Sequence, residues 1–122
     1  MAHFKELIVW QKSIDLVTKI YKVTEKFPSN EIYGLTSQLR RASVSIPSNI
    51  AEGNTRRSKA DYVQFLRIAR GSCSEVETQI IISKNLGFID ENSFEELSFN
   101  IIEISKMLSG LINSLKDSNP TT

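Results

Sequence analysis

Residues 90–116 read DENSFEELSFNIIEISKMLSGLINSLK, and this stretch sets the fold class of the chain. Its apolar residues recur at spacings of three and four, the period of one face of an α-helix. They are Phe94, Leu97, Ile101, Ile104, Leu108, Leu111 and Leu115. Acidic residues crowd the start of the stretch, where they suit the positive end of a helix dipole. We therefore expect a long helix with one nearly unbroken apolar stripe.

The same helical period appears three more times upstream. A helix over residues 4–26 has the predicted core stripe Leu7, Trp10, Ile14, Val17, Tyr21 and Thr24. A helix over residues 31–53 has the predicted stripe Leu35, Leu39, Ala42, Ile46 and Ile50. A helix over residues 58–86 has the predicted stripe Tyr62, Phe65 or Leu66, Ala69, Cys73, Val76 and Ile80. The aromatic rings of the first helix are accordingly expected in the core.

Residues that start and end helices fall between these stripes. Pro28 ends the first helix, because the residue before a proline is pushed out of the α region. Gly53-Asn54 are expected to close the second helix in the left-handed conformation, and Gly87 to close the third. Ser58 is the predicted N-cap of the third helix. Pro47 falls inside the second helix and is expected to kink it or to begin a new turn.

Four helices with short connections predict an all-α protein, an antiparallel up-down-up-down four-helix bundle. The 122 residues suit one domain, expected over residues 1–116 with a disordered C-terminal tail over 117–122. The sequence has no apolar run long enough to cross a membrane and no visible secretory signal. With a single cysteine, Cys73, no internal disulfide can form, so we expect a cytoplasmic protein with no membrane partner.

Several apolar residues lie off the predicted stripes of the third and fourth helices. They are Ile68, Ile81, Ile82, Phe99, Ile102 and Ile112. An isolated bundle buries one stripe per helix, so a second stripe favours a partner, most simply another copy of the chain. The alternative is a wide core face that buries both stripes.

All six arginines lie between residues 40 and 70, and with Lys59 they give this window a net charge of 7 − 2 = +5. The whole chain carries only +1. Arginine differs from lysine because its planar fork matches phosphates and carboxylates bidentately. The segregation of arginine therefore indicates a docking surface in this window.

Two interpretations of the arginines stay open. In the first, these side chains form a protein surface that contacts the phosphates of a nucleic acid. The residues of that surface are Arg56, Arg57, Lys59, Arg67 and Arg70. In the second, the arginines pair with acids, since residues 75–103 carry seven acids and one lysine, a net of −6. The sequence pI of 7.8 weighs against the first interpretation, because basic nucleic-acid-binding domains usually exceed about 9.

The second helix also carries a polar strip beside its apolar stripe, predicted to form a network or an interface. Its residues are Gln38, Arg40, Arg41, Asn49 and Glu52, with Ser45 at similar spacing. For Arg40 and Arg41 we favour structural pairing with acids, with Glu52 nearby. Asn49 and Glu52 share one helical face, which suits a hydrogen-bond network that fixes the register of helices or subunits. A ligand site is the alternative.

The order of motifs resembles a known family. The matching runs are Val9-Trp10-Gln11-Lys12, Gln38-Leu39-Arg40-Arg41-Ala42, Asn49-Ile50-Ala51-Glu52-Gly53 and Phe65-Leu66-Arg67-Ile68-Ala69-Arg70-Gly71-Ser72. They are similar to the four-helix proteins encoded within intervening sequences of bacterial 23S rRNA genes. The resemblance covers residues 4–115 and implies a four-helix protomer in a ring-like homopentamer. That family is also similar to the accessory protein of diversity-generating retroelements, which implies a nucleic-acid or protein partner.

No constellation of catalytic residues is visible in the sequence. His3 is the only histidine, so a zinc site of the usual ligand count is not expected, and no phosphate-binding glycine loop is present. Cys73 lies on an apolar stripe and is interpreted as a small core residue. We therefore expect a non-enzymatic protein without cofactor or metal, one that binds RNA or DNA phosphates. The alternative is a protein–protein interaction scaffold without nucleic-acid affinity.

Overall fold

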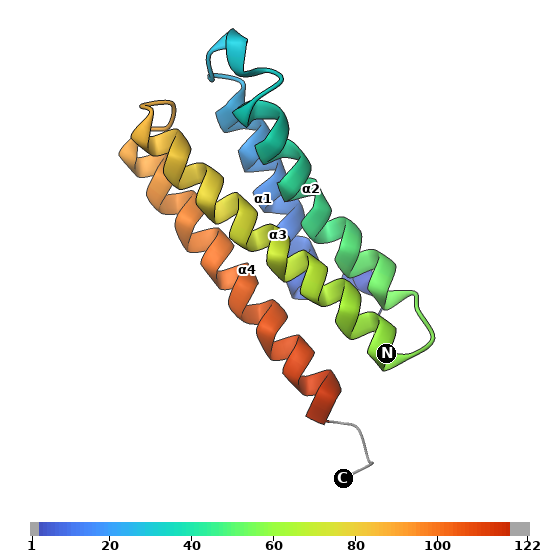
Figure 1. Cartoon of the computed structure of the whole chain (residues 1–122). Helices are drawn as coiled ribbons and strands as arrows, with labels where there is room; N and C mark the ends of the chain where they lie inside the picture. Colours follow the sequence, from blue (N-terminus) through green and yellow to red (C-terminus); the bar gives the residue numbers. More distant parts are fainter. Residues whose placement is uncertain (1–2, 118–122) are drawn as a thin grey trace.

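The computed structural model describes residues 3–117, and within them the chain forms four α-helices and two short 3-10 helices without a strand. The elements are η1 (Phe4–Glu6), α1 (Ile8–Thr24), η2 (Ser29–Glu31), α2 (Leu35–Asn54), α3 (Lys59–Asn85) and α4 (Glu91–Asp117). Figure 1 shows the four helices side by side, with the chain reversing at each connection. The predicted all-α, four-helix class is confirmed.

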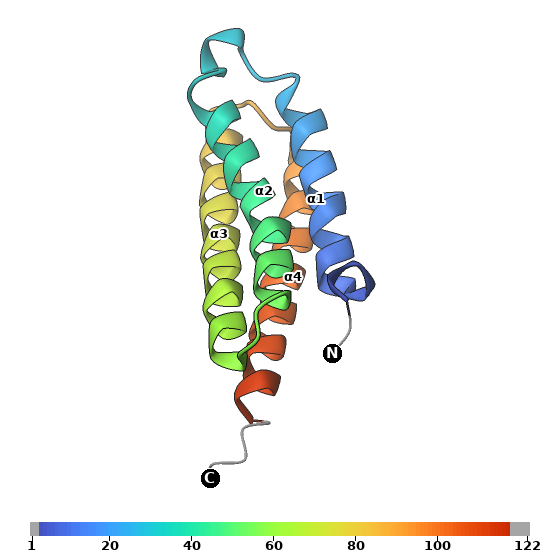
Figure 2. The same cartoon turned by 90° about the vertical axis from the view of Figure 1, so that its right-hand side faces the viewer.

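Each helix packs on two others around one core, because α2 contacts α1 and α3 while α4 contacts α3 and α1. Figure 2 shows α1 and α2 covering one side of the bundle and α3 and α4 the other. The buried stripes of α2, α3 and α4 follow the predicted period. Their most enclosed members are Leu39, Ile46, Ile50, Leu66, Val76, Ile80, Leu97, Ile101, Ile104 and Leu108.

The predicted core stripe of α1 is off by one position in the middle of the helix, whereas Thr24 is buried as predicted and Leu7 and Trp10 pack against the core. The residues of α1 that are buried are Val9, Ser13, Leu16, Ile20 and Thr24. The predicted core residues Ile14 and Tyr21 are instead 38% and 41% exposed. Polar Ser13 and Thr24 tolerate the core because their hydroxyls donate to carbonyls of their own helix, at 2.7 Å to Trp10 O and 2.7 Å to Ile20 O.

The apolar residues off the main stripes stay largely outside the core. Ile68, Ile81, Ile82 and Ile102 are exposed, and Phe99 is 68% exposed. Ile112 is the exception, since it is buried, so its assignment to a second stripe is wrong. The outer surface of α3 and α4 therefore carries exposed apolar side chains that do not contribute to the core of the bundle.

The helix boundaries follow local chemistry. Ser58 caps α3 as predicted, accepting the Asp61 N–H at 3.0 Å. Asp90 accepts the Ser93 N–H at 2.7 Å, and this hydrogen bond lowers the pKa of the Asp90 carboxyl. Gly87 adopts the expected left-handed conformation, with φ of 80°.

Gly53 of α2 departs from the sequence-based expectation, and Pro47 lies within the helix as expected. Gly53 is not left-handed. A Cβ built on Gly53 would lie 2.7 Å from the Phe65 Cβ, so this glycine permits the close approach of α2 and α3. The helix also continues through buried Pro47 without beginning a new turn there.

Candidate nucleic-acid interface

The turn between α2 and α3 carries three predicted nucleic-acid contacts, Arg56, Arg57 and Lys59. Arg56 is already engaged within the chain, because its Nη2 lies 3.0 Å from Oε1 of Glu52 and its guanidinium lies 4.8 Å from the centre of the Phe65 ring. Arg57 and Lys59 are both exposed on the surface of this turn. The Arg56 charge is therefore partly neutralised, which the (i, i+4) spacing from Glu52 to Arg56 signals in the sequence.

The cations of α3 lie on the side of the helix that faces α4. Lys59 and Arg67 line one surface hollow together with Lys116 of α4. One turn further along, Arg70 Nη1 donates to Ser109 Oγ of α4 at 3.2 Å. The prediction that these α3 residues share one side of the helix is confirmed.

Two lysines of α4 extend this positive surface. Lys116 lines the hollow, and exposed Lys106 lies about one helical turn before Ser109 on α4. Sequence reasoning missed both, because nothing in the sequence shows that the end of α4 lies beside the start of α3. We name the resulting surface the α3–α4 basic face, and it comprises Lys59, Arg67, Arg70, Lys106 and Lys116.

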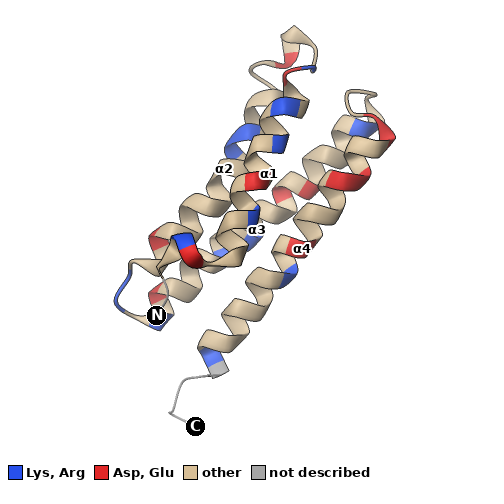
Figure 3. Cartoon of the chain, turned by 180° about the vertical axis from the view of Figure 1, so that it is seen from behind, with Lys and Arg blue, Asp and Glu red and all other residues tan. Residues whose placement is uncertain are grey.

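The hollow in the α3–α4 basic face has a volume of about 310 Å³ and is open to solvent. Its described lining contains three cations and no acid. Figure 3 shows the same segregation along α4 as far as Lys116, with acids on its first half and lysines on its second. Positive charge thus collects where α3 begins and α4 ends, which strengthens the attraction for an extended anion.

Arg40 has a structural role that involves no ion pair with an acid among the described residues. Its Nε donates to Thr24 Oγ1 at 2.9 Å, and its guanidinium lies 4.5 Å from the centre of the Tyr21 ring. Glu52, the expected nearby acid, pairs with Arg56 instead. Arg40 therefore links α2 to the end of α1 by hydrogen bonds to Thr24 and to the Tyr21 carbonyl and by a cation–π contact.

Part of the polar strip of α2 forms hydrogen bonds that reach α3. Asn49 Nδ2 donates to the carbonyl and hydroxyl oxygens of Ser45, at 2.8 and 2.9 Å. Ser72 Oγ of α3 lies 2.9 Å from the same hydroxyl. These partly buried contacts link α2 to α3 at one defined register, whereas Glu52 lies at the exposed end of the strip.

The remaining strip residues, Gln38 and Arg41, line a second pocket, which we name the α2–α3 pocket. Its volume is about 350 Å³, and its lining is completed by Ala42, Ser45, Glu75 and Gln79. Gln38 and Arg41 are both exposed, so the pocket is accessible from solvent. The structure therefore separates the predicted strip into an interhelical hydrogen-bond network and a pocket wall.

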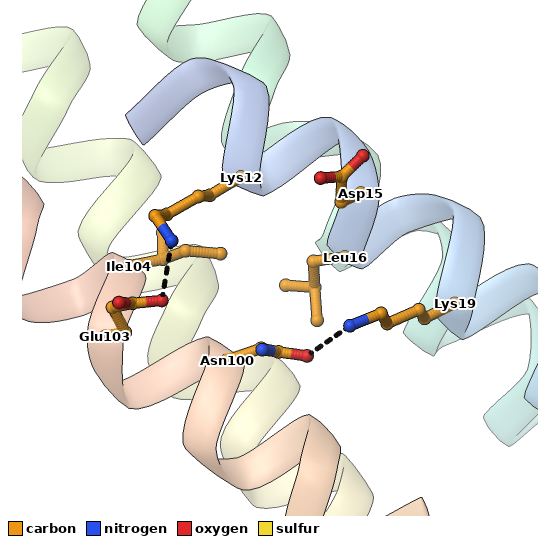
Figure 4. A pocket seen from close by; sticks show the side chains of 7 residues that line it. All are labelled: Lys12, Asp15, Leu16, Lys19, Asn100, Glu103 and Ile104. Atoms are coloured by element: carbon orange, nitrogen blue, oxygen red, sulfur yellow. Dashed lines mark hydrogen bonds and ion pairs between the residues drawn. The ribbon is translucent and has the colours of Figure 1, made fainter. Parts of the chain in front are cut away.

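A different kind of contact joins α1 to α4. Lys12 Nζ lies 3.2 Å from Oε1 of Glu103, and Lys19 Nζ donates to Asn100 Oδ1 at 3.1 Å. Figure 4 shows both lysines reaching from α1 across a pocket of about 150 Å³ toward α4. These lysines stabilise the seam between the first and last helices, although exposed pairs of this kind contribute at most about 1 kcal/mol each.

An apolar groove runs along the outer side of α1 and α2. It has a volume of about 310 Å³. Its lining residues are Phe4, Trp10, Ile14, Val17, Val44, Pro47, Ser48 and Ala51. Trp10, Ile14 and Val17 are the residues that the sequence analysis assigned to the core stripe of the first helix. Their side chains form a concave apolar surface beside the core, and Trp10 also packs against the core residues.

Cys73 is buried in the core, which confirms its predicted place there. Burial raises the pKa of the Cys73 thiol to about 12, with a smaller contribution from the charge of Glu77. Across residues 3–117, no group of three histidine, cysteine or acidic side chains is arranged to hold a metal ion. No helix in this range is long and apolar enough to cross a membrane.

The sequence matches a protein family, and the fold matches a solved structure. The family described as 23S rRNA-intervening sequence protein matches residues 5–110. A solved protein of unknown function from the S23 ribosomal protein family of Bacteroides thetaiotaomicron is 26% identical, with a TM-score of 0.78. That match covers 86% of this chain and 98% of the other. No curated protein matches the sequence.

Proposed function

The chain belongs to the 23S rRNA-intervening sequence protein family, and we propose that it is a non-enzymatic, cytoplasmic homo-oligomer that binds the phosphate backbone of RNA or DNA. The binding surface in this proposal is the α3–α4 basic face. Family membership agrees with the four-helix fold, whereas the case for phosphate binding rests on the charge of this one surface.

The observation that carries the proposal is the gathering of cations from two helices around one open hollow. Arg67 and Lys116 line it beside Lys59, with no acid in its described lining. Arg70 is oriented toward α4 by its hydrogen bond to Ser109. Cations spaced along two neighbouring helices suit consecutive phosphates, and such contacts position a nucleic acid without reading its sequence.

Self-association is supported by two apolar surfaces on different helix pairs. One is the α1–α2 groove with Trp10 and Ile14, and the other is the exposed set that includes Phe99 and Ile102 on α4. Different patches that meet head to tail form a heterologous contact, which closes into a ring when the rotation allows. We propose a ring-like homopentamer of up-down-up-down protomers, the subunit number resting on the family resemblance.

A ring would repeat the α3–α4 basic face once per protomer. Each protomer then contributes a weak, salt-sensitive contact, and a strand long enough to touch several protomers gains affinity through effective concentration. This explains how a chain with a net charge of only +1 can act as a nucleic-acid binder. The local charge and its repetition matter more than the average charge.

The proposal is tested by removing charge from the basic face without touching the core. In the variant Arg67→Gln/Lys106→Gln/Lys116→Gln, all three positions are exposed, so stability should change little. Fluorescence anisotropy with labelled RNA and DNA should show a loss of affinity of at least about tenfold at moderate salt. Lys22→Gln, an exposed charge on α1, is the matched control and should bind like wild type. Equal affinities for the triple variant and the control would contradict the proposal.

A further inference from the structure

The α2–α3 pocket brings together opposite charges that do not neutralise each other. Arg41 of α2 and Glu75 of α3 line the same pocket of about 350 Å³. Among the described residues, neither takes part in an ion pair. The volume falls near the lower end of the range of about 300–1,000 Å³ that is typical of small-ligand sites. The pocket therefore offers a cationic donor and an anionic acceptor to a third group.

Gln79 adds a buried acceptor that lacks a donor. Its Oε1 is shielded from solvent and is the one buried side-chain nitrogen or oxygen of the described residues without a hydrogen-bond partner. An unsatisfied buried polar atom costs about 1–3 kcal/mol, so a donor that reached this oxygen would be favoured. The neighbouring Ser45 hydroxyl is already engaged with Asn49 and Ser72. A ligand that both donates and accepts hydrogen bonds therefore suits this pocket.

The charges restrict the chemistry of that ligand. An anion would be attracted by Arg41 and repelled by Glu75, and a cation would experience the reverse. A neutral group with an acceptor edge and a donor edge satisfies both side chains. Guanine has this pattern, because O6 and N7 accept from an arginine fork while its N1–H and exocyclic amine donate. Those donor hydrogens match the Glu75 carboxylate, which lies in the lining of the pocket.

We propose that the α2–α3 pocket receives an unpaired guanine base of a single-stranded nucleic acid. This inference rests on the proposed function, because α3 carries the pocket on its α2 side and the basic face on its α4 side. Glu75 follows Arg70 by five residues, about 7.5 Å along the helix axis. A strand that crosses α3 can place phosphates on the basic face and one base in the pocket. Proteins commonly read single strands by base edges in this way.

The test compares a short labelled oligouridine with the same strand carrying one central guanosine. Wild-type protein should bind the guanosine strand at least about fivefold more tightly, the lower end expected for one bidentate base contact. Replacing the guanosine by 7-deazaguanosine removes N7, and replacing it by inosine removes the exocyclic amine. Each replacement should reduce the preference.

Variants assign these effects to side chains. Arg41→Gln should abolish the preference for guanosine and the sensitivity to 7-deazaguanosine. Glu75→Gln should abolish the difference between guanosine and inosine. Lys22→Gln should retain all three behaviours. Neither Arg41 nor Glu75 is in the core, so the variant proteins should fold, which circular dichroism checks.

The outcomes separate this inference from the proposed function. If oligouridine binds in a salt-dependent way but guanosine adds nothing, the pocket inference is overturned and phosphate binding stands. If neither strand binds, both are overturned. A guanosine preference that survives in Arg41→Gln also overturns the inference. A difference in oligomer mass between Arg41→Gln and wild type, measured by light scattering, also overturns the inference, because the pocket would then be a contact between copies of the chain.

Discussion

Gly53→Ala should destabilise the protein, although alanine is the better helix former. A Cβ at position 53 would lie 2.7 Å from the Phe65 Cβ and 3.0 Å from Cδ1 of Tyr62. The Phe65 Cβ is fixed to its backbone and cannot rotate away, so α2 and α3 must separate. Overpacking of this kind costs about 1–3 kcal/mol, and the gain of up to about 1 kcal/mol in helix propensity offsets only part of it. We expect a net loss of about 1–2 kcal/mol.

Gly71→Ala provides the matched control, because it is the same substitution in the neighbouring helix. A Cβ at position 71 meets nothing within 4 Å, so only the propensity term remains. This variant should be stabilised by up to about 1 kcal/mol. Thermal unfolding is followed by circular dichroism at equal protein concentration. The Tm should be roughly 4–8 °C lower than wild type for Gly53→Ala and a few degrees higher for Gly71→Ala. A Gly53→Ala protein as stable as wild type would refute the close α2–α3 approach.

Further predictions concern the core, the α1–α2 link and the assembly. Cys73, with its pKa raised to about 12, should react slowly with iodoacetamide at pH 8 in the folded protein and quickly in denaturant. Fast modification of the folded protein would contradict the buried position of Cys73. Arg40→Ala should lower the free energy of unfolding in urea by about 1–2 kcal/mol, because it loses two contacts with α1, whereas Arg41→Ala should change it by less than about 0.5 kcal/mol. Light scattering should give wild-type protein a mass several times 13.8 kDa and Phe99→Glu a smaller one, and a wild-type monomer would contradict the assembly.

The sequence predicts the core stripes of α2, α3 and α4, because their predicted members recur at positions that the structure buries wholly or in part. It fails in the middle of α1, where two apolar stripes overlap at neighbouring positions. The sequence favoured the stripe through Trp10 and Ile14, since the true stripe is interrupted by Ser13. Only the structure shows that the Ser13 hydroxyl is satisfied by its own helix, so a polar residue can be buried there without penalty.

The candidate interface was predictable only in part. The arginine-rich window pointed to Arg67 and Arg70, which the structure places on one side of α3. Lys106 and Lys116 are separated from them by more than thirty residues, and their contribution depends on how α4 lies against α3. Two further features also required coordinates, namely the engagement of Arg40 with the end of α1 and the unpartnered Oε1 of Gln79. Contacts between distant segments do not follow from periodicity.

The salt dependence of nucleic-acid affinity tests the central claim most directly. Counterion release predicts that the logarithm of the binding constant falls linearly with the logarithm of salt concentration, by about 0.7 per phosphate contact for a single strand and 0.9 for a duplex. If the five cations of the α3–α4 basic face contact phosphates, wild-type protein should show a slope of roughly −3 to −5 for each protomer engaged. Unrelated sequences should give similar slopes. A binding constant that does not change with salt, or no binding at low salt, would contradict the account.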